Sequence, residues 1–412
     1  MRLPRILTIA GASVIVVALA GVLAFTGRVS AAPSTPQASS SFTFTHSCAA
    51  VAGAAHCNAI VRTGGKGGAG PALTSGCGVT DPASGYEPCD LIAAYKLPSS
   101  TAGGGQTVAI VDAYNDPNAE ADLGVYRSTF GLAPCTTANG CFRKVNQTGG
   151  TNYPRNDGGW SEEISLDLDM VSAICPNCHI LLVEASSSSL TNLGTAVNEA
   201  ATLGATEISN SYGGSESSSD TSYDTSYYQH PGIAITVSSG DSGYGVQYPA
   251  ASQYVTAVGG TSLTQASNTR GWTETAWSGA GSGCSKYDAQ PSWQSSVSNI
   301  TTYCGKRAVA DVSAVADPNT GVDVYDSYSY RGQSGWLVFG GTSVASPVVA
   351  SVYALAGNAS SVTYGSYSYS HTSGMFDVTS GSNGSCGNDL CNATTGWDGP
   401  TGNGTPNGTG GF

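Results

Sequence analysis

From about Gly85, apolar runs alternate with segments of helically spaced apolar residues, whereas the tail from Ser380 is rich in Gly, Asn and Thr. This pattern predicts strands over residues 107–112, 179–184, 207–212 and 233–238, and helices over residues 118–130, 161–174 and 192–203. Strand alternating with helix is typical of an α/β fold, in which helices cover both faces of a mostly parallel sheet. We therefore expect a single domain over residues 85–412, with functional groups at the carboxyl ends of its strands.

The N-terminal 32 residues have the features of a secretory signal peptide. Arg2 and Arg5 precede an apolar run from Ile6 to Phe25, and small residues at 29–32 supply a cleavage site. The run is also long enough for an uncleaved membrane anchor, which stays open as an alternative. Residues 33–84 are predicted to form a disulfide-rich extension, and the mature protein is expected to be secreted, with no membrane association after signal cleavage.

The composition supports an exported protein. Only 10% of the 412 residues are charged, and the net charge is −13 at pH 7, which argues against a nucleic-acid partner. Twelve cysteines in an exported chain imply disulfides. We expect neighbours in the sequence to pair, as Cys48/Cys57, Cys77/Cys89, Cys135/Cys141, Cys175/Cys178, Cys284/Cys304 and Cys386/Cys391. The 175/178 pair has the spacing of a redox motif, but a tight structural loop is favoured over redox chemistry or zinc.

A candidate nucleophile lies in the segment Gly341-Thr342-Ser343, which precedes a predicted small-residue helix over residues 344–355. Glycine lets the backbone turn tightly, and a serine at a helix N-terminus lies where an oxyanion is stabilised. A serine hydroxyl needs an adjacent base, yet none of the five histidines lies in a recognisable catalytic motif. A Gly-Ser turn that only caps the helix is the alternative for these residues.

A pair of carboxylates offers another base. Glu163 and Asp167 are one helical turn apart, so both face the same way, and their apolar neighbours suggest partial burial. Close carboxylates cannot both ionise easily, and the raised pKa of such a pair would let it act as a base in acid, where histidine is protonated. The alternative is a solvated acidic helix face.

Four stretches, in the same order and spacing, resemble motifs of the sedolisins, the serine-carboxyl peptidases. They are residues 160–180 with Glu163 and Asp167, residues 238–261 with Asp241, residues 311–318, and Gly341-Thr342-Ser343 with Pro347. The resemblance covers roughly Gly85 to the C-terminus and implies a subtilisin-like fold, made as a short form without the usual long pro-domain.

The resemblance also implies catalytic roles, residue by residue. Ser343 would be the nucleophile, Glu163 its general base and acid, and Asp167 the residue that holds Glu163 in place. Asp241 would form the oxyanion hole, and it can donate a hydrogen bond there only while protonated, which again ties activity to acid. Asp112 would either join these carboxyl groups or merely form the turn at its strand end.

Two further sites follow from the resemblance. The substrate-binding segment would be Ser211, Tyr212, Gly213 and Gly214, whose backbone would pair with an extended peptide as an added strand. One calcium ion would be held by the Asp377 and Asp398 carboxylates and by backbone carbonyls of Val378, Thr394 and Gly396. The alternative for the second site is a pair of Asx-turns.

The expected function is therefore that of a secreted, acid-active, monomeric serine endopeptidase acting on polypeptides through a Ser343 acyl-enzyme. Two departures from the family pattern are Gly340, where serine is usual, and Thr394, where glycine is usual. One alternative is a neutral subtilisin-like serine protease, which would need a His-Gly-Thr helix and an asparagine in place of Asp241. Another is a non-catalytic secreted binding protein on a peptidase scaffold. The sequence does not by itself separate endopeptidase from tripeptidyl-peptidase action, which depends on whether loops close the non-primed side of the cleft.

Overall fold

The computed structural model describes residues 42–64 and 82–412. The predicted signal peptide and Cys77 lie outside the described residues. Within them, no helix is both long and apolar enough to cross a membrane.

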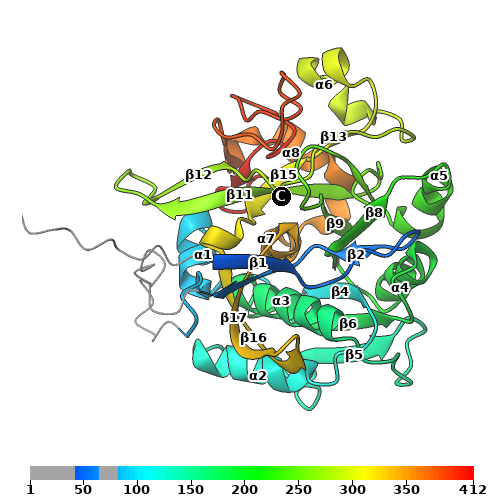
Figure 1. The fold of residues 1–412 in the computed structure, drawn as a ribbon, viewed down its shortest axis with the longest axis vertical. Helices are drawn as coiled ribbons and strands as arrows, with labels where there is room; N and C mark the ends of the chain where they lie inside the picture. The colour runs from blue at the N-terminus through cyan, green and yellow to red at the C-terminus, as the bar shows by residue number, and fades with distance from the viewer. Residues whose placement is uncertain (1–41, 65–81) are drawn as a thin grey trace, which may run out of the picture. The chain divides into compact units, whose positions relative to one another are not determined.

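An eight-stranded sheet forms the centre of the fold, as the sequence predicts (Figure 1). Its order is β12 (Trp272–Ala276), β11 (Thr256–Gln265), β9 (Ala234–Ser238), β7 (Glu207–Asn210), β4 (Thr107–Ala113), β6 (His179–Ala185) and β5 (Phe142–Asn146), and β15 (Val312–Val315) also pairs with β11. All these pairs are parallel except that of β11 with β12.

Successive residues of a strand face opposite sides of the sheet, and in these strands the residues on both sides are apolar. Helices therefore cover both faces of the sheet. On β4, Val108 and Ile110 belong to the core shared with α1 (Pro88–Tyr95), α2 (Ala119–Thr129), α3 (Gly158–Ile174) and α7 (Thr342–Ala356). Ala109 and Val111 belong to the opposite core, which includes α4 (Leu190–Thr202). The core of one face therefore surrounds α3 and α7, which carry the candidate catalytic residues.

Smaller sheets flank the central one. β1 (Phe42–His46), β3 (Ile60–Gly64), β17 (Gln333–Gly340) and β16 (Val322–Tyr330) form one, and β2 (His56–Cys57), β8 (Tyr212–Ser215) and β10 (Gln247–Tyr248) form another. Two-stranded ladders join β13 (Gly283–Cys284) to β14 (Ala308–Val309) and β18 (Met375–Phe376) to β19 (Thr405–Pro406). The remaining α-helices of the described residues are α5 (Asp220–Tyr223), α6 (Ser298–Tyr303) and α8 (Tyr367–Ser370).

Two boundaries differ from the sequence prediction. The predicted strand over residues 207–212 breaks at Ser211, because β8 leaves the central sheet and pairs with β2 and β10 instead. The predicted helix over residues 344–355 begins at Thr342, because Gly341 at φ 98° ends β17 and lets the helix start at once.

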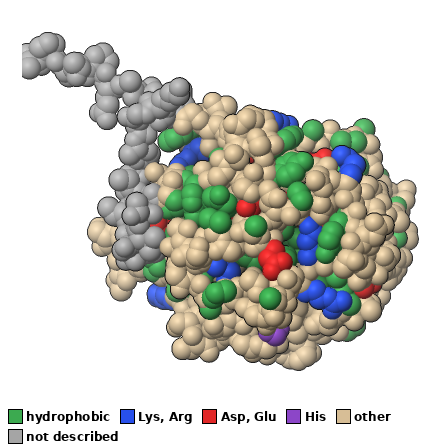
Figure 2. Space-filling view, turned by 90° about the horizontal axis from the view of Figure 1, so that it is seen from below, with side chains coloured by type: hydrophobic (Ala, Val, Ile, Leu, Met, Phe, Trp, Pro, Cys, Tyr) green, Lys and Arg blue, Asp and Glu red, His purple; other side chains and the backbone are tan. Residues whose placement is uncertain are grey.

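The disulfide prediction is confirmed wherever both cysteines are described. The pairs are Cys48–Cys57, Cys135–Cys141, Cys175–Cys178, Cys284–Cys304 and Cys386–Cys391. Cys89 is also disulfide-bonded. The surface agrees with the low charge of the sequence: Figure 2 shows a face where charged side chains are scattered among uncharged polar groups and backbone.

A buried ion pair anchors the strand that leads to β15. Arg307 and Asp311 are both fully buried and share two hydrogen bonds, one of them 2.8 Å between Nη1 and Oδ1. The same carboxylate accepts hydrogen bonds from the Ala257 backbone N–H and the Tyr369 hydroxyl, both at 2.8 Å. A paired and fully hydrogen-bonded buried charge is costly to disrupt, since removal of one partner strands the other.

We therefore expect Asp311→Ala to lower the free energy of unfolding by about 3–5 kcal/mol, because Arg307 would remain buried without its partner. The urea midpoint measures this loss. Arg155 forms an ion pair with Asp157 but is 65% exposed, so Arg155→Ala should cost at most about 1 kcal/mol. Equal losses in the two variants would contradict the structural role of the buried pair.

Candidate active site

Helix α3 presents two carboxyl groups toward the carboxyl ends of the strands. The Asp157 side chain caps its start by accepting a hydrogen bond from the Trp160 N–H at 3.3 Å. Glu163 and Asp167 are four residues apart, and the structure buries both completely. The alternative of a solvated acidic face is therefore excluded.

The turn before α7 delivers Ser343 to the same place. A Cβ on Gly341 would lie 1.9 Å from the Asn58 carbonyl oxygen, and the positive φ of this residue also favours glycine. A Cβ on Gly340 would lie 2.4 Å from the Pro318 nitrogen, so a serine at this position would require the backbone around Pro318 to shift. Ser343 lies in the first turn of α7 and is 0% exposed.

Pro347 links the serine helix to the carboxyl groups. Proline has no backbone N–H, so the Ser343 carbonyl one turn earlier loses its usual helical partner. That carbonyl instead accepts a hydrogen bond from the Ser211 hydroxyl at 3.4 Å. The same hydroxyl lies 2.8 Å from Asp167 Oδ1, so a protonated Asp167 could donate to Ser211 while Ser211 donates to Ser343.

Burial gives the α3 carboxyl groups high proton affinity. It raises the pKa of Glu163 well above its usual value, with further contributions from the charges of Asp167 and Asp112, while the nearby Ser343 hydroxyl opposes the shift. Burial and the charge of Asp112 likewise raise the pKa of Asp167. Asp112, fully buried at the end of β4, has a raised pKa through burial and the charge of Glu184. It therefore belongs electrostatically to the carboxyl network rather than to an isolated turn.

Asp241 approaches Ser343 from the other side, on the loop after β9. Its Oδ1 accepts hydrogen bonds from both the backbone N–H and the hydroxyl of Thr342, each at 2.8 Å. Burial raises the pKa of Asp241 to about 7, and the two bonds from Thr342 oppose the shift. Below that pH the group is a neutral acid, and its Oδ2 lies beside Gly341. Thr342 is a positioning residue that the sequence analysis did not identify.

The predicted substrate-binding segment is paired with a strand of the chain itself. β8 forms antiparallel pairs with β2, matching Tyr212 with Cys57 and Gly213 with His56. The Ala59 N–H then donates to Glu163 Oε2 at 2.9 Å. Nothing in the apolar pattern of residues 56–60 predicts this position, because it depends on pairing with segments more than 100 residues away.

The predicted metal residues lie together in the C-terminal loops. Asp377 Oδ2 accepts the Gly396 N–H at 3.0 Å, and Asp398 Oδ2 accepts the Thr394 N–H at 3.0 Å. Burial raises the pKa of Asp398 to about 7, and the charge of Asp377 contributes to the shift. Val378, whose carbonyl was also predicted as a ligand, follows Asp377 directly and is buried. Carboxylates are hard oxygen donors, so a loop region that brings two of them together fits a hard cation such as calcium.

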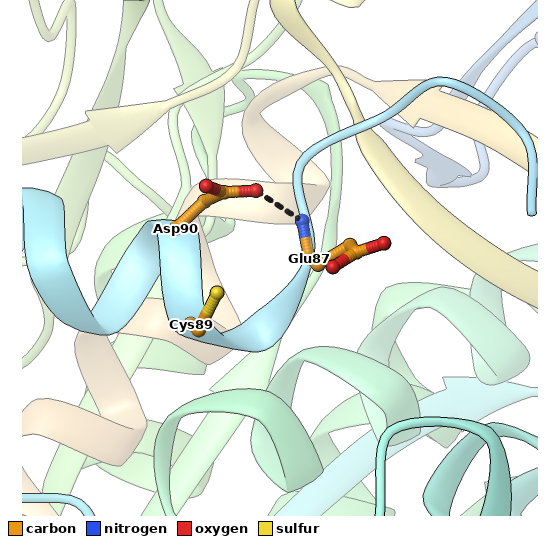
Figure 3. A group of neighbouring side chains, drawn as sticks. All are labelled: Glu87, Cys89 and Asp90. Atoms are coloured by element: carbon orange, nitrogen blue, oxygen red, sulfur yellow. Dashed lines mark hydrogen bonds between the residues drawn. The ribbon is translucent and has the colours of Figure 1, made fainter. Parts of the chain in front are cut away.

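Another group of metal-type side chains has a structural explanation. Glu87, Cys89 and Asp90 lie within 4.8 Å of one another at the start of α1 (Figure 3). Glu87 and Asp90 form a reciprocal capping box, in which the Glu87 N–H donates to Asp90 Oδ2 at 3.1 Å. The Cys89 sulfur is in a disulfide and therefore offers no thiolate ligand. This group caps a helix.

The chain is similar to the subtilisin-like class of peptidases. The Subtilase family matches residues 147–371, which is more than half of the chain. The solved structure of Pseudomonas sedolisin, a serine-carboxyl proteinase complexed with two molecules of pseudo-iodotyrostatin, matches with a TM-score of 0.66 and 30% identity, covering 79% of this chain and 96% of that chain.

Within this class, the chain is similar in sequence to the sedolisins. Sedolisin from Pseudomonas sp. (strain 101) is 30% identical over 364 residues, covering 78% of this chain and 59% of sedolisin. Kumamolisin from Bacillus sp. (strain MN-32) is 30% identical over 298 residues, covering 65% of this chain and 51% of kumamolisin. The chain thus belongs to the sedolisin family within the subtilisin-like peptidases, and it spans little more than half the length of these curated relatives.

The raised carboxyl pKa values have a consequence for stability. A carboxyl whose folded pKa exceeds its unfolded pKa binds its proton more tightly in the folded state, so its stabilising effect is complete below the unfolded pKa. That effect is lost as the pH rises from about 4 toward the folded pKa of about 7 for Asp241. We expect the thermal midpoint to be highest near pH 4 and to fall toward pH 8.

Differential scanning calorimetry across this range measures the trend. Asp241→Asn, which mimics the protonated side chain, should show a smaller fall between about pH 4 and pH 7 than the parent. A midpoint that rises over this interval would contradict the protonation assigned to the buried carboxyl groups.

Proposed function

We propose that this chain is a secreted, acid-active serine-carboxyl endopeptidase. The observation that carries the proposal is that Glu163 and Asp241 both lie beside residues 58–59, at the turn that carries Ser343. The Ser343 hydroxyl lies next to Glu163, and Asp167 lies one helical turn further along α3. The relatives include a named serine-carboxyl proteinase. The disulfides of the described residues and the predicted signal peptide support export to an oxidising compartment.

In the proposed reaction, Glu163 takes the proton of the Ser343 hydroxyl as the serine oxygen attacks the substrate carbonyl carbon. The negative charge that develops on the carbonyl oxygen would be stabilised by the protonated Asp241 and by the N-terminus of α7. Glu163 then gives its proton to the leaving amine. The Ala59 N–H donates to Glu163 Oε2 at 2.9 Å, which supports the proposal that a peptide nitrogen can come within reach of this carboxyl group. Water releases the acyl group by the same steps in reverse order.

The carboxyl groups suit this chemistry in acid. A base must have a pKa near the working pH, and burial with like charges raises that of Glu163 above an ordinary carboxyl. Asp167 lies one helical turn from Glu163 in the same buried environment and would hold Glu163 in place. Above about pH 7, Asp241 would ionise and lose its donor, so activity would fall there even if the base remained competent.

Polypeptides are the proposed substrates, bound as an added antiparallel strand on residues 211–214. The pairing of β8 with β2 supports this, because it satisfies the backbone of an extended segment at that edge. The proposed working form is a monomer.

We also propose that one calcium ion organises the C-terminal loops. The Asp377 and Asp398 carboxylates and the carbonyls of Val378, Thr394 and Gly396 would hold it, and the like charges of the two aspartates support a bound cation. Its role would be structural.

Ser343→Ala should reduce cleavage of a denatured protein at about pH 4 by roughly 10,000-fold or more while leaving the fold intact, because the nucleophile is gone. Peptide release followed by mass spectrometry measures activity, and circular dichroism checks the fold. Ser351→Ala is the matched control, since its hydroxyl lies buried on the same helix without a hydrogen-bond partner and should be dispensable. A Ser343→Ala enzyme as active as the parent would refute the assignment.

Removal of calcium should lower the thermal midpoint. At a free calcium concentration 100 times the dissociation constant, the bound ion stabilises the fold by about 2.7 kcal/mol, and EDTA removes this contribution. Asp398→Asn should abolish the difference between calcium and EDTA, whereas Asp389→Asn in the neighbouring loop should keep it. An unchanged midpoint of the parent in EDTA would eliminate the proposed site.

A further inference from the structure

Residues 56–60 cross the candidate active site in an extended conformation. On one side they pair with β8, and on the other they pair with β17, the strand that leads to Ser343. Asn58 and Ala59, at the centre of this crossing, are 1% and 0% exposed. The contacts of each residue tell how the segment is aligned with the catalytic groups.

The residues before the centre make the backbone contacts of a peptide bound to the proposed substrate segment. The Asn58 N–H donates to the Ser211 carbonyl at 3.1 Å, and Cys57 and His56 continue the antiparallel ladder along β8. A disulfide between Cys57 and Cys48 holds this stretch in place. Main-chain pairing of this kind fixes the register of a bound strand.

The Asn58 side chain has a fitted polar environment. Its amide nitrogen donates to Ser238 Oγ at 2.8 Å and to Gln247 Oε1 at 3.4 Å. The Gln247 side chain also packs against Gly213 and Gly240, where added Cβ atoms would come within 2.2 Å and 2.8 Å of it. Ser238 and Gln247 therefore form a site for a small side chain with an amide donor.

The Asn58 carbonyl points at the proposed oxyanion position. Its oxygen lies 1.9 Å, and Asp241 Oδ2 lies 2.6 Å, from the point that a Cβ on Gly341 would occupy. The two oxygens are therefore neighbours at the turn just before Ser343. A neutral Asp241 in this position can donate to the carbonyl oxygen as negative charge develops on it.

Residues 59–61 contact Glu163 and the strand β17. The Ala59 N–H donates to Glu163 Oε2 at 2.9 Å, so the amide nitrogen contacts the proposed general acid. Ile60 pairs with Gly340 and Val61 with Phe339 on β17. The carbonyl of one peptide bond thus lies beside Asp241, its nitrogen contacts Glu163, and the bond lies next to the turn that leads into Ser343.

We propose that the Asn58–Ala59 peptide bond is the chain's own cleavage site, and that residues 56–60 block the active site until this bond is cut. The inference rests on the proposed function, because it assigns to that same site its first substrate. It also identifies Ser238 and Gln247 as residues that determine specificity for asparagine before the cut.

The chemistry balances without an added reagent other than water. The Ser343 oxygen bonds to the Asn58 carbonyl carbon, the bond to the Ala59 nitrogen breaks, and the serine proton passes through Glu163 to that nitrogen. Water then attacks the ester, one of its protons returns through Glu163 to Ser343, and Asn58 is left with a carboxyl group. Cys48 and Cys57 both lie before the cut, so their disulfide does not join the two products.

Purified full-length chain, first held at about pH 8, is shifted to about pH 4 and sampled over time. N-terminal sequencing should reveal a new terminus at Ala59, formed at a rate independent of protein concentration because the bond is held within the same molecule. Cleavage of a denatured protein, followed in parallel, should begin only as this terminus appears. Ser343→Ala should remain uncut.

Ala59→Pro should also remain uncut and latent, since proline cannot donate to Glu163. Ala52→Pro is the matched control: it lies at the second position of a turn closed by the Ala54 N–H and the Val51 carbonyl, followed by Gly53 at φ 77°, where proline fits. Asn58→Leu, similar in shape but without the amide, should be cut at least about 10-fold more slowly while its thermal midpoint stays near that of the parent.

The outcomes separate the two proposals. A parent that degrades the denatured protein while its Asn58–Ala59 bond stays intact overturns this inference and leaves the proposed function standing. A rate that rises in proportion to protein concentration also overturns it, because the cut is then between molecules. A parent that cleaves neither itself nor the denatured protein at any pH refutes the proposed function, and this inference with it.

Discussion

Carboxyl groups that are buried beside one another set the constraint on which this structure depends. Glu163, Asp167 and Asp112 lie in one interior region, where ionising all of them would cost several kcal/mol per charge. They must therefore share protons, and the fold must hold them rigidly enough to do so. The packing of α3 against α7 provides that rigidity. In the proposed mechanism, the same constraint lets a carboxyl group take the place of a histidine base, because imidazole would be protonated at the acid pH where these groups still exchange protons.

Backbone geometry then determines what the acids can act on. Gly341 has no Cβ, so a carbonyl oxygen can come close to the turn before Ser343 and meet Asp241 there. Pro347 frees the Ser343 carbonyl, and the Ser211 hydroxyl that it engages also contacts Asp167. The helix that carries Ser343, the segment that begins at Ser211 and the helix that carries Asp167 are thereby joined through one hydroxyl group. A displacement of any of these three elements would therefore alter the hydrogen bonds of the other two.

Much of this could be predicted from the sequence where the signal is local or periodic. The i, i+4 spacing brings Glu163 and Asp167 together on any helix, and alternating strands and helices indicate the parallel sheet. The departure of β8 from the central sheet could not be predicted, because its partners are β2 and β10, which are two residues each and distant in the chain. The sequence did not predict a role for Asn58 for a related reason. Asn58 contacts Ser211 and Ser238, and its neighbour Ala59 contacts Glu163, all of which are distant in the chain. Asn58 also lies outside the region that resembles the sedolisins.

The covalent attachment of residues 56–60 explains how so short a segment could block an active site. A tethered strand is present at a high effective concentration, so a free polypeptide must compete with a partner that never diffuses away. Hydrolysis after Asn58 would remove this high effective concentration only for the residues before the cut, because the residues after it stay attached to the main chain. β3 keeps its pairing with β17 as part of the main chain. Residues 42–58 would be held by non-covalent contacts, among them the hydrogen bonds to β3 and β8, because the Cys48–Cys57 disulfide lies wholly within them. The half that leaves is therefore the half on the substrate-binding segment, where the next polypeptide must bind.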